Sequence, residues 1–525
     1  MRVCRALAIL KENAMKQFLT PFADSIHGSL GCFDRLLFKG YLPISYPASM
    51  ERWLASQAIL LKDFKSFVTT QSDRLKAHAQ QLAAKAGRPY QYLSRPIRKD
   101  DAARQIAQRD GVTQGLICVF AILEQAQSFQ LRYGEGRPRL VSTQPRCLCL
   151  YFYYLDRDFG LMHVRLQTWF PFTVQIYVNG HSWLERQLQR RRLGFTACDN
   201  AFTSLADPAR TQKLADKLPT LNWPRILAVF ARRVNPLLAD LLGDMTYYWV
   251  TDQAEYATDI LFRDAATLAR LYPQWLEHAT LRFSAEDVMT FLGRKLTGQF
   301  AGELRSVTNR RWPGARVKHR MKANWIKMYD KFGCVLRIET VINDPTEFRV
   351  RRKGMRNGQE VLGWFPMAKR VSNLNRYAAI GQAANARYLA ALTAASDPAR
   401  AYRQLEELCR PVTRDGRRHR ALNPLSRRDS ASFQAVLRGE HHLRGFRAAA
   451  VARDLGWPPT NDPAERQRRS ARLNRSLRLL RAHGLIAKIP HSRRWRVTAV
   501  GVTRMTAILH LQTQPLPVTK LKMAA

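Results

Sequence analysis

A regular alternation of polar and apolar side chains in residues 162–180 restricts the fold of this chain more than any other sequence feature. The segment reads "MHVRLQTWFPFTVQIYVNG". Its first half alternates His, Arg and Gln with Val and Leu, and its second half alternates Gln and Tyr with Val and Ile. Because successive side chains of a strand point to opposite faces, we expect neighbouring strands of a sheet with one buried and one polar face.

Further segments extend this interpretation to an α+β chain of several domains. Apolar runs at 115–124 and 146–155 predict buried strands, and "WIKMYDKFGCVLRIET" predicts a hairpin. A length of 525 residues is enough for two to four domains. We expect a mixed or antiparallel sheet body with helical insertions. The expected boundaries are an α/β region at 1–181, a mainly helical region at 182–300, a basic hairpin and helical region at 301–409, a linker at 410–429, a separate C-terminal domain at 430–512 and a tail at 513–525.

The charge of the chain predicts a polyanionic partner. Lys and Arg number 85 against 41 Asp and Glu, which gives a formal net charge of +44. Such an excess repels itself in the folded state, and nucleic acid relieves that repulsion. No apolar run approaches the length of a spanning helix, so we expect no membrane partner. We also expect no secretory signal, because the first residues carry only a short apolar stretch without a small-residue cleavage site.

The eight cysteines contain no C-x-x-C pair, so no structural zinc site is expected. Cys147 and Cys149 are spaced by two, which places both thiols on one face of a strand. Buried reduced thiols fit a cytoplasmic, nucleoid-associated protein.

The C-terminal segment carries an amphipathic helix with one basic side. In "RSARLNRSLRLLRAHGLI", Leu473, Leu477 and Leu480 fall on one helical stripe. A row of arginines falls on the opposite side: Arg468, Arg472, Arg475 and Arg478. A solvated face would mix charges of both signs, whereas this segment has no acid after Glu465. We therefore expect contact with duplex DNA.

The order of predicted elements from about 430 to 510 resembles the winged helix-turn-helix of bacterial DNA-binding regulators. Three helices are followed by two short strands around a basic turn and a closing helix. The resemblance implies that the arginine-rich helix enters the major groove. It also implies that the turn and second strand, with Arg493, Arg494 and Arg496, contact phosphates or the neighbouring minor groove.

A second basic segment, Arg305–Lys331, contains nine Lys or Arg residues and a single acid, Asp330. We expect it to contact nucleic acid through phosphates rather than bases. The candidate residues are Arg310, Arg311, Arg316, Lys318, Arg320 and Lys322.

Four carboxylates in apolar surroundings are candidates for a metal centre. Asp34 lies within "CFDRLLF", Glu124 ends "ICVFAILE", and Glu255 and Asp259 are spaced i, i+4 in "AEYATDILF". On a helix that spacing lets Glu255 and Asp259 point at one ion. The four could hold Mg²⁺ or Mn²⁺ for phosphodiester cleavage or strand transfer. The alternative is ordinary ion pairing, of Asp34 with Arg35 or Lys39 and of the helical pair with Arg263.

Two further resemblances concern the whole chain and one hairpin. Phrases such as "QTWFPF", "Q.EYATD" and "RLLRAHGLI" are similar to an often multicopy bacterial family of about 500 residues, which implies a mobile-element origin. The stretch "IKMYDKFGCVLRIET" resembles the Y-D-K … R-x-E strands of rolling-circle replication initiators, which nick DNA with a tyrosine and a divalent metal. Here the upstream stretch "NRRWPGARVKHRMKANW" has no tyrosine. Asp330 and Glu339 of this hairpin would otherwise form cross-strand ion pairs with Lys331 or Arg337.

Two hypotheses remain at the level of sequence: a DNA-binding protein without catalysis, and a metal-dependent nuclease, transposase or replication initiator. Nucleotide-driven motors, dehydrogenases and zincins lack support, because the chain has no Walker, Rossmann or H-E-x-x-H motif. An enzyme should gather the four candidate carboxylates around one ion, whereas a binding protein should distribute them among basic partners.

Overall fold

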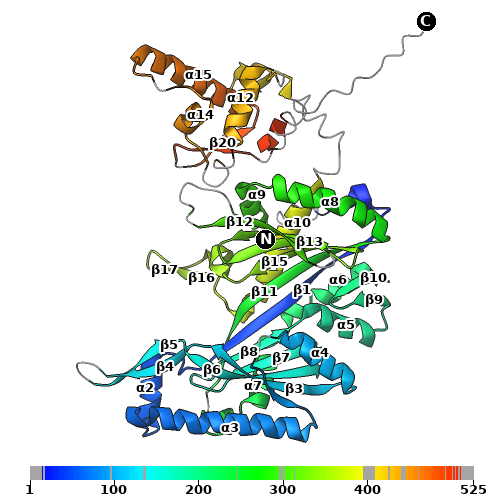
Figure 1. Cartoon of the computed structure of the whole chain (residues 1–525), viewed down its shortest axis with the longest axis vertical. Helices are drawn as coiled ribbons and strands as arrows, with labels where there is room; N and C mark the ends of the chain where they lie inside the picture. Colours follow the sequence, from blue (N-terminus) through cyan, green and yellow to red (C-terminus); the bar gives the residue numbers. More distant parts are fainter. Residues whose placement is uncertain are drawn as a thin grey trace. The chain divides into compact units, whose positions relative to one another are not determined.

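The computed structural model shows a mixed α+β protein, as the sequence predicts (Figure 1). It describes residues 18–94, 97–133, 137–243, 245–294, 302–311, 314–393, 408–423, 426–438, 445–458, 460–490 and 492–498, with a few single residues beside these ranges. The expected tail at 513–525 lies outside the described residues. Among the described helices, none has both the length and the apolar content needed to cross a membrane.

The chain divides into two compact units, and each is built from segments distant in sequence. Unit 1 contains residues 1–26, 262–338 and 383–525, and unit 2 contains residues 27–261 and 339–382. These units do not follow the expected boundaries near 181 and 300. Strands from residues 26–41, 248–262 and 335–342 are neighbours in one sheet, so hydrogen bonds join segments that lie far apart in the sequence.

Unit 2 is built around a mixed sheet. Its strand order is β15-β11-β1-β8-β7-β6-β3-β2. The bounds are β1 Ile26–Tyr41, β2 Tyr90–Tyr92, β3 Gly115–Gln125, β6 Arg146–Asp156, β7 Gly160–Gln167, β8 Val174–Val178, β11 Tyr248–Phe262 and β15 Val335–Ile342, of which Glu339–Ile342 belongs to this unit. β2 pairs with β3 in parallel, and β3, β6, β7, β8 and β1 pair antiparallel in turn. Hairpins of this unit outside the sheet are β4 Ser128–Arg132 with β5 Arg139–Thr143, β9 Phe195–Cys198 with β10 Ala201–Leu205, and β16 Arg349–Arg356 with β17 Gln359–Pro366.

Helices cover both faces of this sheet. The bounds are α2 Pro47–Ser56, α3 Phe64–Lys85, α4 Lys99–Arg109, α5 Gly180–Arg190, α6 Pro208–Ala215 and α7 Trp223–Val234. α7 packs on the face that contains Phe38, whose ring lies 4.7 Å from that of Trp223. α4 packs on the opposite face, against Cys118, Phe120 and Tyr151. The predicted alternation is confirmed, since Val164 and Leu166 are fully buried on the α7 side. The expectation that only one face is buried is wrong, because Arg165 and Gln167 on the polar side retain only 8% and 0% exposure.

Unit 1 contains an antiparallel meander and two groups of helices. Its strands are β12 Leu304–Arg311, β13 Gly314–Met321, β14 Asn324–Lys331 and the first half of β15, in that order. The predicted β14–β15 hairpin is confirmed. The helices beside these strands are α8 Ala265–Leu281, α9 Ala285–Phe291 and α10 Leu374–Leu392, of which the part from Ala383 onward belongs to this unit. The rings of half-buried Phe283 and buried Phe291 and Tyr388 pack together.

The C-terminal segment has its own hydrophobic core. Its elements are β18 Val412–Arg414, β19 Arg417–His419, α12 Arg427–Val436, α14 Ala448–Asp454, α15 Pro463–Ala482, β20 Ile486–Lys488 and β21 Trp495–Val497. α15 begins with Asp462, whose carboxylate accepts hydrogen bonds from the Ala464 and Glu465 amides. It ends before Gly484, which has a φ of +71°.

The expected linker at 410–429 is a folded hairpin and the start of a helix. Leu422 belongs to the C-terminal core. Arg420 forms a two-point ion pair with Asp429, with N–O distances of 2.9 and 2.7 Å. The described residues of this segment form the β18–β19 hairpin, with its turn at Asp415 and Gly416, and the cap of α12 at Ser426.

The other helices in the described part of the chain are short 3₁₀ turns: η1 Thr20–Phe22, η2 Leu61–Asp63, η3 Leu218–Thr220, η4 Pro236–Ala239, η5 Pro345–Glu347 and η6 Val371–Asn373.

Candidate metal centre

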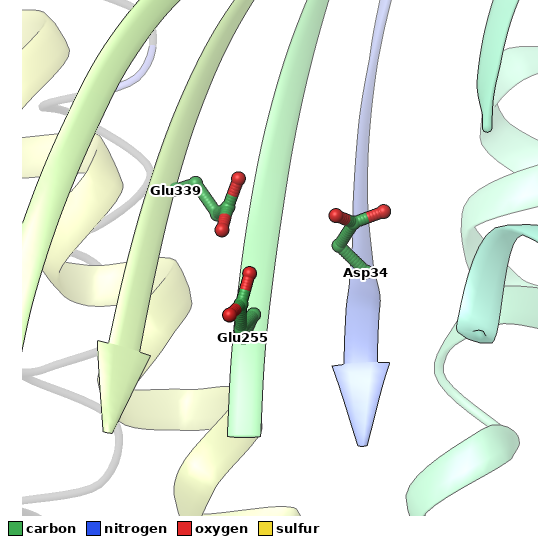
Figure 2. A group of neighbouring side chains, drawn as sticks. All are labelled: Asp34, Glu255 and Glu339. Atoms are coloured by element: carbon green, nitrogen blue, oxygen red, sulfur yellow. The ribbon is translucent and has the colours of Figure 1, made fainter. Parts of the chain in front are cut away.

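Three carboxylates meet on the first three strands of the unit 2 sheet, β15, β11 and β1. Asp34 of β1, Glu255 of β11 and Glu339 of β15 each offer an oxygen, and these oxygens all lie within 4.8 Å of one another. Figure 2 shows the three side chains directed toward a common space from three neighbouring strands. Their exposed fractions are only 9%, 8% and 1%. Three acids buried together in one place require positive charge close by.

Asp34 is held by a group of polar side chains near the start of α5. Asn200 donates a hydrogen bond from Nδ2 to Asp34 Oδ1 at 2.6 Å, and Asn179 donates one at 3.5 Å. His181 Nδ1 lies 3.3 Å from the same oxygen. These contacts fix the orientation of the Asp34 carboxylate before any ligand arrives.

Gly180 allows α5 to approach β1 closely enough for these contacts. A Cβ atom at this position would lie 2.2 Å from the carbonyl oxygen of Phe33, a distance that side chains do not reach. The helix begins here because the Asn179 side chain caps it by accepting the Ser182 amide at 3.0 Å. Sequence and packing together therefore place His181 beside Asp34.

The prediction that Glu255 and Asp259 lie on a helix and share one ion is wrong. Both lie in the strand β11. Residues i and i+4 of a strand do share a face, but at about 3.3 Å per residue they are about 13 Å apart. Asp259 is instead 3.3 Å from Nε2 of His181, whose other ring nitrogen faces Asp34. His181 thus separates Asp259 from the three-carboxylate cluster.

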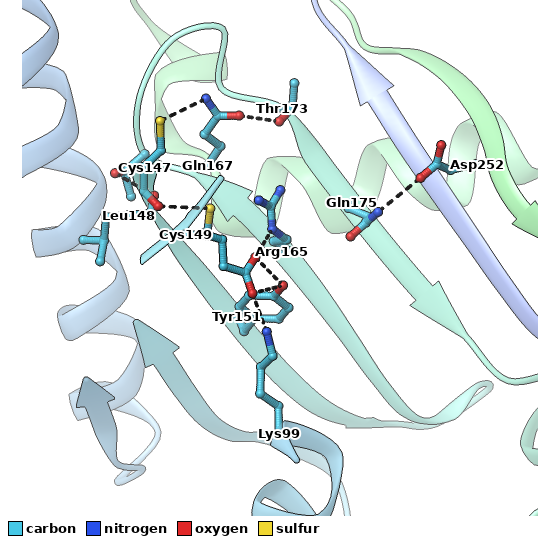
Figure 3. A network of polar contacts seen from close by, with 12 residues as sticks. Lys99, Cys147, Leu148, Cys149, Tyr151, Arg165, Gln167, Thr173, Gln175 and Asp252 are labelled. Atoms are coloured by element: carbon cyan, nitrogen blue, oxygen red, sulfur yellow. Dashed lines mark hydrogen bonds and ion pairs between the residues drawn. The ribbon is translucent and has the colours of Figure 1, made fainter. Parts of the chain in front are cut away.

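The candidate Glu124 also lies outside the cluster. Its carboxylate accepts hydrogen bonds from Lys99 at 2.5 Å, from Tyr151 at 2.8 Å and from Arg165 at 3.0 Å. Figure 3 shows the three donors, Lys99 at the start of α4, Tyr151 on β6 and Arg165 on β7. Burial raises the pKa of Glu124, but these hydrogen bonds and positive charges outweigh it and lower the pKa overall. Glu124 is thus surrounded by basic partners, as the hypothesis of a DNA-binding protein without catalysis predicts.

The ligand atoms of the cluster fit a divalent cation. At 4.8 Å and an effective dielectric constant of 20, two full charges repel by about 3.5 kcal/mol. Arg35, next to Asp34, responds to these charges: burial lowers its pKa, but Glu255, Tyr177 and Asp34 raise it overall. Carboxylate oxygens are the ligands that Mg²⁺ and Mn²⁺ prefer, so the three side chains fit such an ion.

The predicted DNA-contacting arginines of α15 are exposed, and the leucines behind them are buried. Leu473, Leu477 and Leu480 retain at most 5% exposure. The exposed arginines are Arg468, Arg472, Arg475 and Arg478. Arg493 is also exposed, whereas Arg494 and Arg496 are half-buried.

The central basic candidates lie on β12, β13 and the turn after β13. Arg320 is exposed, and Arg316, Lys318 and Lys322 are half-buried. Lys322 occupies the turn with a φ of +54°. Arg310 and Arg311 are the remaining candidates; they lie in β12, with side chains outside the described part of the structure.

Sequence reasoning did not identify Glu339 as a partner of Asp34 and Glu255, nor His181 as a neighbour of Asp34. The only signal for Glu339 was the resemblance of its hairpin to replication initiators. His181 carried no signal, because the contact depends on α5 returning to β1.

No protein-family model, curated protein or solved structure matches this chain.

Proposed function

We propose that the protein binds duplex DNA through its C-terminal segment, folded as a winged helix with α15 as the recognition helix. The observation that carries this proposal is the exposed arginine row of α15, opposite a buried leucine stripe. The order α12, α14, α15, β20, β21 supports it, as does an isolated β-bridge between Phe446, before α14, and Trp495 of β21. α15 would lie in the major groove and the β20–β21 turn against the backbone.

Binding measurements with arginine variants of the full chain test this role. Arg472→Ala together with Arg475→Ala should weaken specific duplex binding by about 1–3 kcal/mol for each arginine that holds a guanine edge. Arg493→Ala should weaken all sequences about equally, because phosphate contacts carry no base information. The target sequence is first selected from random duplexes. If the double α15 variant binds the selected duplex like the parent, α15 is not the recognition helix.

A second candidate function, metal-dependent cleavage or joining of phosphodiester bonds, is favoured by the carboxylate cluster. In this proposal Asp34, Glu255 and Glu339 would hold Mg²⁺ or Mn²⁺. A bound ion supplies a more acidic water or hydroxyl and neutralises charge on the phosphate. The chain's own residues orient that site: Asn200 and His181 fix the Asp34 carboxylate, and Asp259 fixes the far side of the His181 ring.

Cleavage assays on labelled single-stranded and duplex DNA, with and without Mg²⁺ or Mn²⁺, test the second function. Asp34→Asn and Glu339→Gln should each reduce metal-dependent cleavage or joining by at least about a hundredfold, while Glu124→Gln, in the separate Lys99–Arg165 network, should retain it. If the parent never cuts or joins these substrates, or if Asp34→Asn acts like the parent, the protein only binds nucleic acid.

A further inference from the structure

One face of the β12–β13–β14 meander gathers positive and aromatic side chains in three cross-strand rows. Cross-strand pairing aligns Arg305 with Arg320 and Trp325, then Val307 with Lys318 and Lys327, then Asn309 with Arg316 and Tyr329. We call these nine positions the basic–aromatic face. Its residues come from strands adjacent in sequence, and all lie within unit 1.

The opposite face of the meander fixes which way these side chains point. Val317, Met321, Ile326 and Met328 alternate with them and are fully buried. His319, on the same buried side, hydrogen-bonds to the Tyr388 hydroxyl at 3.0 Å. The buried side is thus held in the core, which leaves the basic–aromatic face turned away from it. Arg305, Asn309 and Arg320 of that face are exposed, and its other residues are half-buried.

The charge on this face is one-sided. Five of its nine residues are Arg or Lys, and none is acidic. Two like-charged pairs stand directly opposite each other across strands, Arg305 with Arg320 and Lys318 with Lys327. Directly opposed like charges destabilise a sheet, so an anion lying over the rows would relieve a repulsion built into the pairing.

Two side-chain donors on the face have no acceptor in the described part of the structure. They are Nε of Arg316 and Nε1 of Trp325. Buried donors ordinarily have a partner, and phosphate or base oxygens accept from N–H groups of this kind. The Lys318 ammonium also lies 3.7 Å from the ring centroid of Trp325, which sets a cation beside an aromatic ring.

We propose that the basic–aromatic face binds single-stranded nucleic acid. Trp325 and Tyr329 stack on unpaired bases, and the surrounding Arg and Lys residues contact the phosphates. An open sheet face with aromatic rings suits unstacked bases, because a duplex keeps its base faces inside the helix. This surface is distinct from the duplex-binding helix α15, and its function does not depend on that role.

Fluorescence anisotropy on the full chain tests the proposal with labelled (dT)20, (U)20 and a 20-base-pair duplex. Trp325→Ala with Tyr329→Ala should weaken binding of the single strands by about 5- to 150-fold for each base that no longer stacks, and should leave duplex binding unchanged. Trp325→Phe should retain most single-strand binding, because phenylalanine also stacks.

A charge variant controls for misfolding of the Trp325→Ala, Tyr329→Ala variant. Arg305→Glu with Arg320→Glu alters only exposed side chains and should weaken single-strand binding. It should also flatten the salt dependence of that binding, by about 0.7 in the logarithmic slope for each phosphate that the face no longer neutralises. Lys62→Glu with Lys65→Glu, an equal charge change at exposed positions of η2 and α3 in unit 2, should have a much smaller effect.

The outcomes separate this surface from α15. Loss of single-strand binding in the face variants, with duplex binding lost only when Arg472 and Arg475 are replaced, supports the proposal. Tighter binding of (U)20 than (dT)20 would identify RNA as the preferred strand, and the reverse would identify DNA. The proposal is overturned if the aromatic double variant binds both single strands within twofold of the parent. Equal weakening of duplex and single strand would also overturn it.

Discussion

The substitution Glu255→Gln distinguishes a metal centre from a structural ion-pair cluster. It keeps the shape of the side chain and removes one of three mutually close charges. Two of the three carboxylate pairs lose their repulsion, which amounts to about 7 kcal/mol for full charges at 4.8 Å and an effective dielectric constant of 20. Arg35 offsets part of this, so we expect the metal-free variant to be more stable than the metal-free parent by about 1–3 kcal/mol.

Divalent metal should reverse the order of stabilities. At a concentration 100 times its dissociation constant, an ion that binds only the folded state stabilises the parent by about 2.7 kcal/mol. For a unit of this size that corresponds to a rise of about 5 °C in Tm. Glu255→Gln should show little or none of this rise, because one of three ligands has lost its charge.

Thermal unfolding in EDTA and in Mn²⁺ or Mg²⁺ measures both effects, and calorimetry measures binding directly. Glu124→Gln is the matched control: it should be less stable than the parent in EDTA, since Lys99 and Arg165 lose a partner, and it should keep the full metal response. If Glu255→Gln instead destabilises the metal-free protein by about 3–5 kcal/mol, and metal does not stabilise the parent, the carboxylates are structural ion pairs and the argument is refuted.

Three further predictions concern packing, pH and thiol chemistry. Gly180→Ala should lower stability and weaken the metal response in thermal unfolding, because its Cβ would displace α5 from β1; an unchanged response would contradict the role of Gly180. Burial raises the pKa of Asp429, but hydrogen bonds from Arg420 and a backbone amide lower the pKa overall. The ionised Asp429 therefore stabilises the folded state fully above its ordinary pKa near 3.8, and this stabilisation is lost as pH falls through the lower folded pKa. Arg420→Gln should therefore lower the stability by about 1–2 kcal/mol at neutral pH. It should also move the acid-induced loss of hydrogen-exchange protection in α12 to higher pH. Cys198 is exposed, whereas burial raises the pKa of Cys149 to about 12. A thiol reagent should therefore label Cys198 rapidly and Cys149 only after unfolding, and mass spectrometry would identify the labelled residue.

The sequence by itself determined the local features of this protein. The alternation in 162–180 predicted strands with one apolar face, and the spacing of Leu473, Leu477 and Leu480 predicted a helix with its arginines outward. Both patterns depend on the repeat of a single element, which is 2 residues for a strand and 3.6 for a helix, so no knowledge of distant contacts was needed. The hairpin formed by β14 and β15 was likewise readable, because its two strands are adjacent in the chain.

Only the tertiary structure decided which acids meet. Asp34, Glu255 and Glu339 are separated by 221 and 84 residues, and they come together because β1 and β15 both pair with β11. Glu255 and Asp259 looked closer in sequence, but an extended strand moves them about 13 Å apart where a helix would have stacked them. Whether a segment is a helix or a strand sets the distance between residues that are close in sequence. The order of strands in the sheet sets the distance between residues that are far apart in sequence. Neither strand order nor the approach of α5 to β1 is encoded in a short window of residues, which is why the candidate metal centre emerged only from the fold.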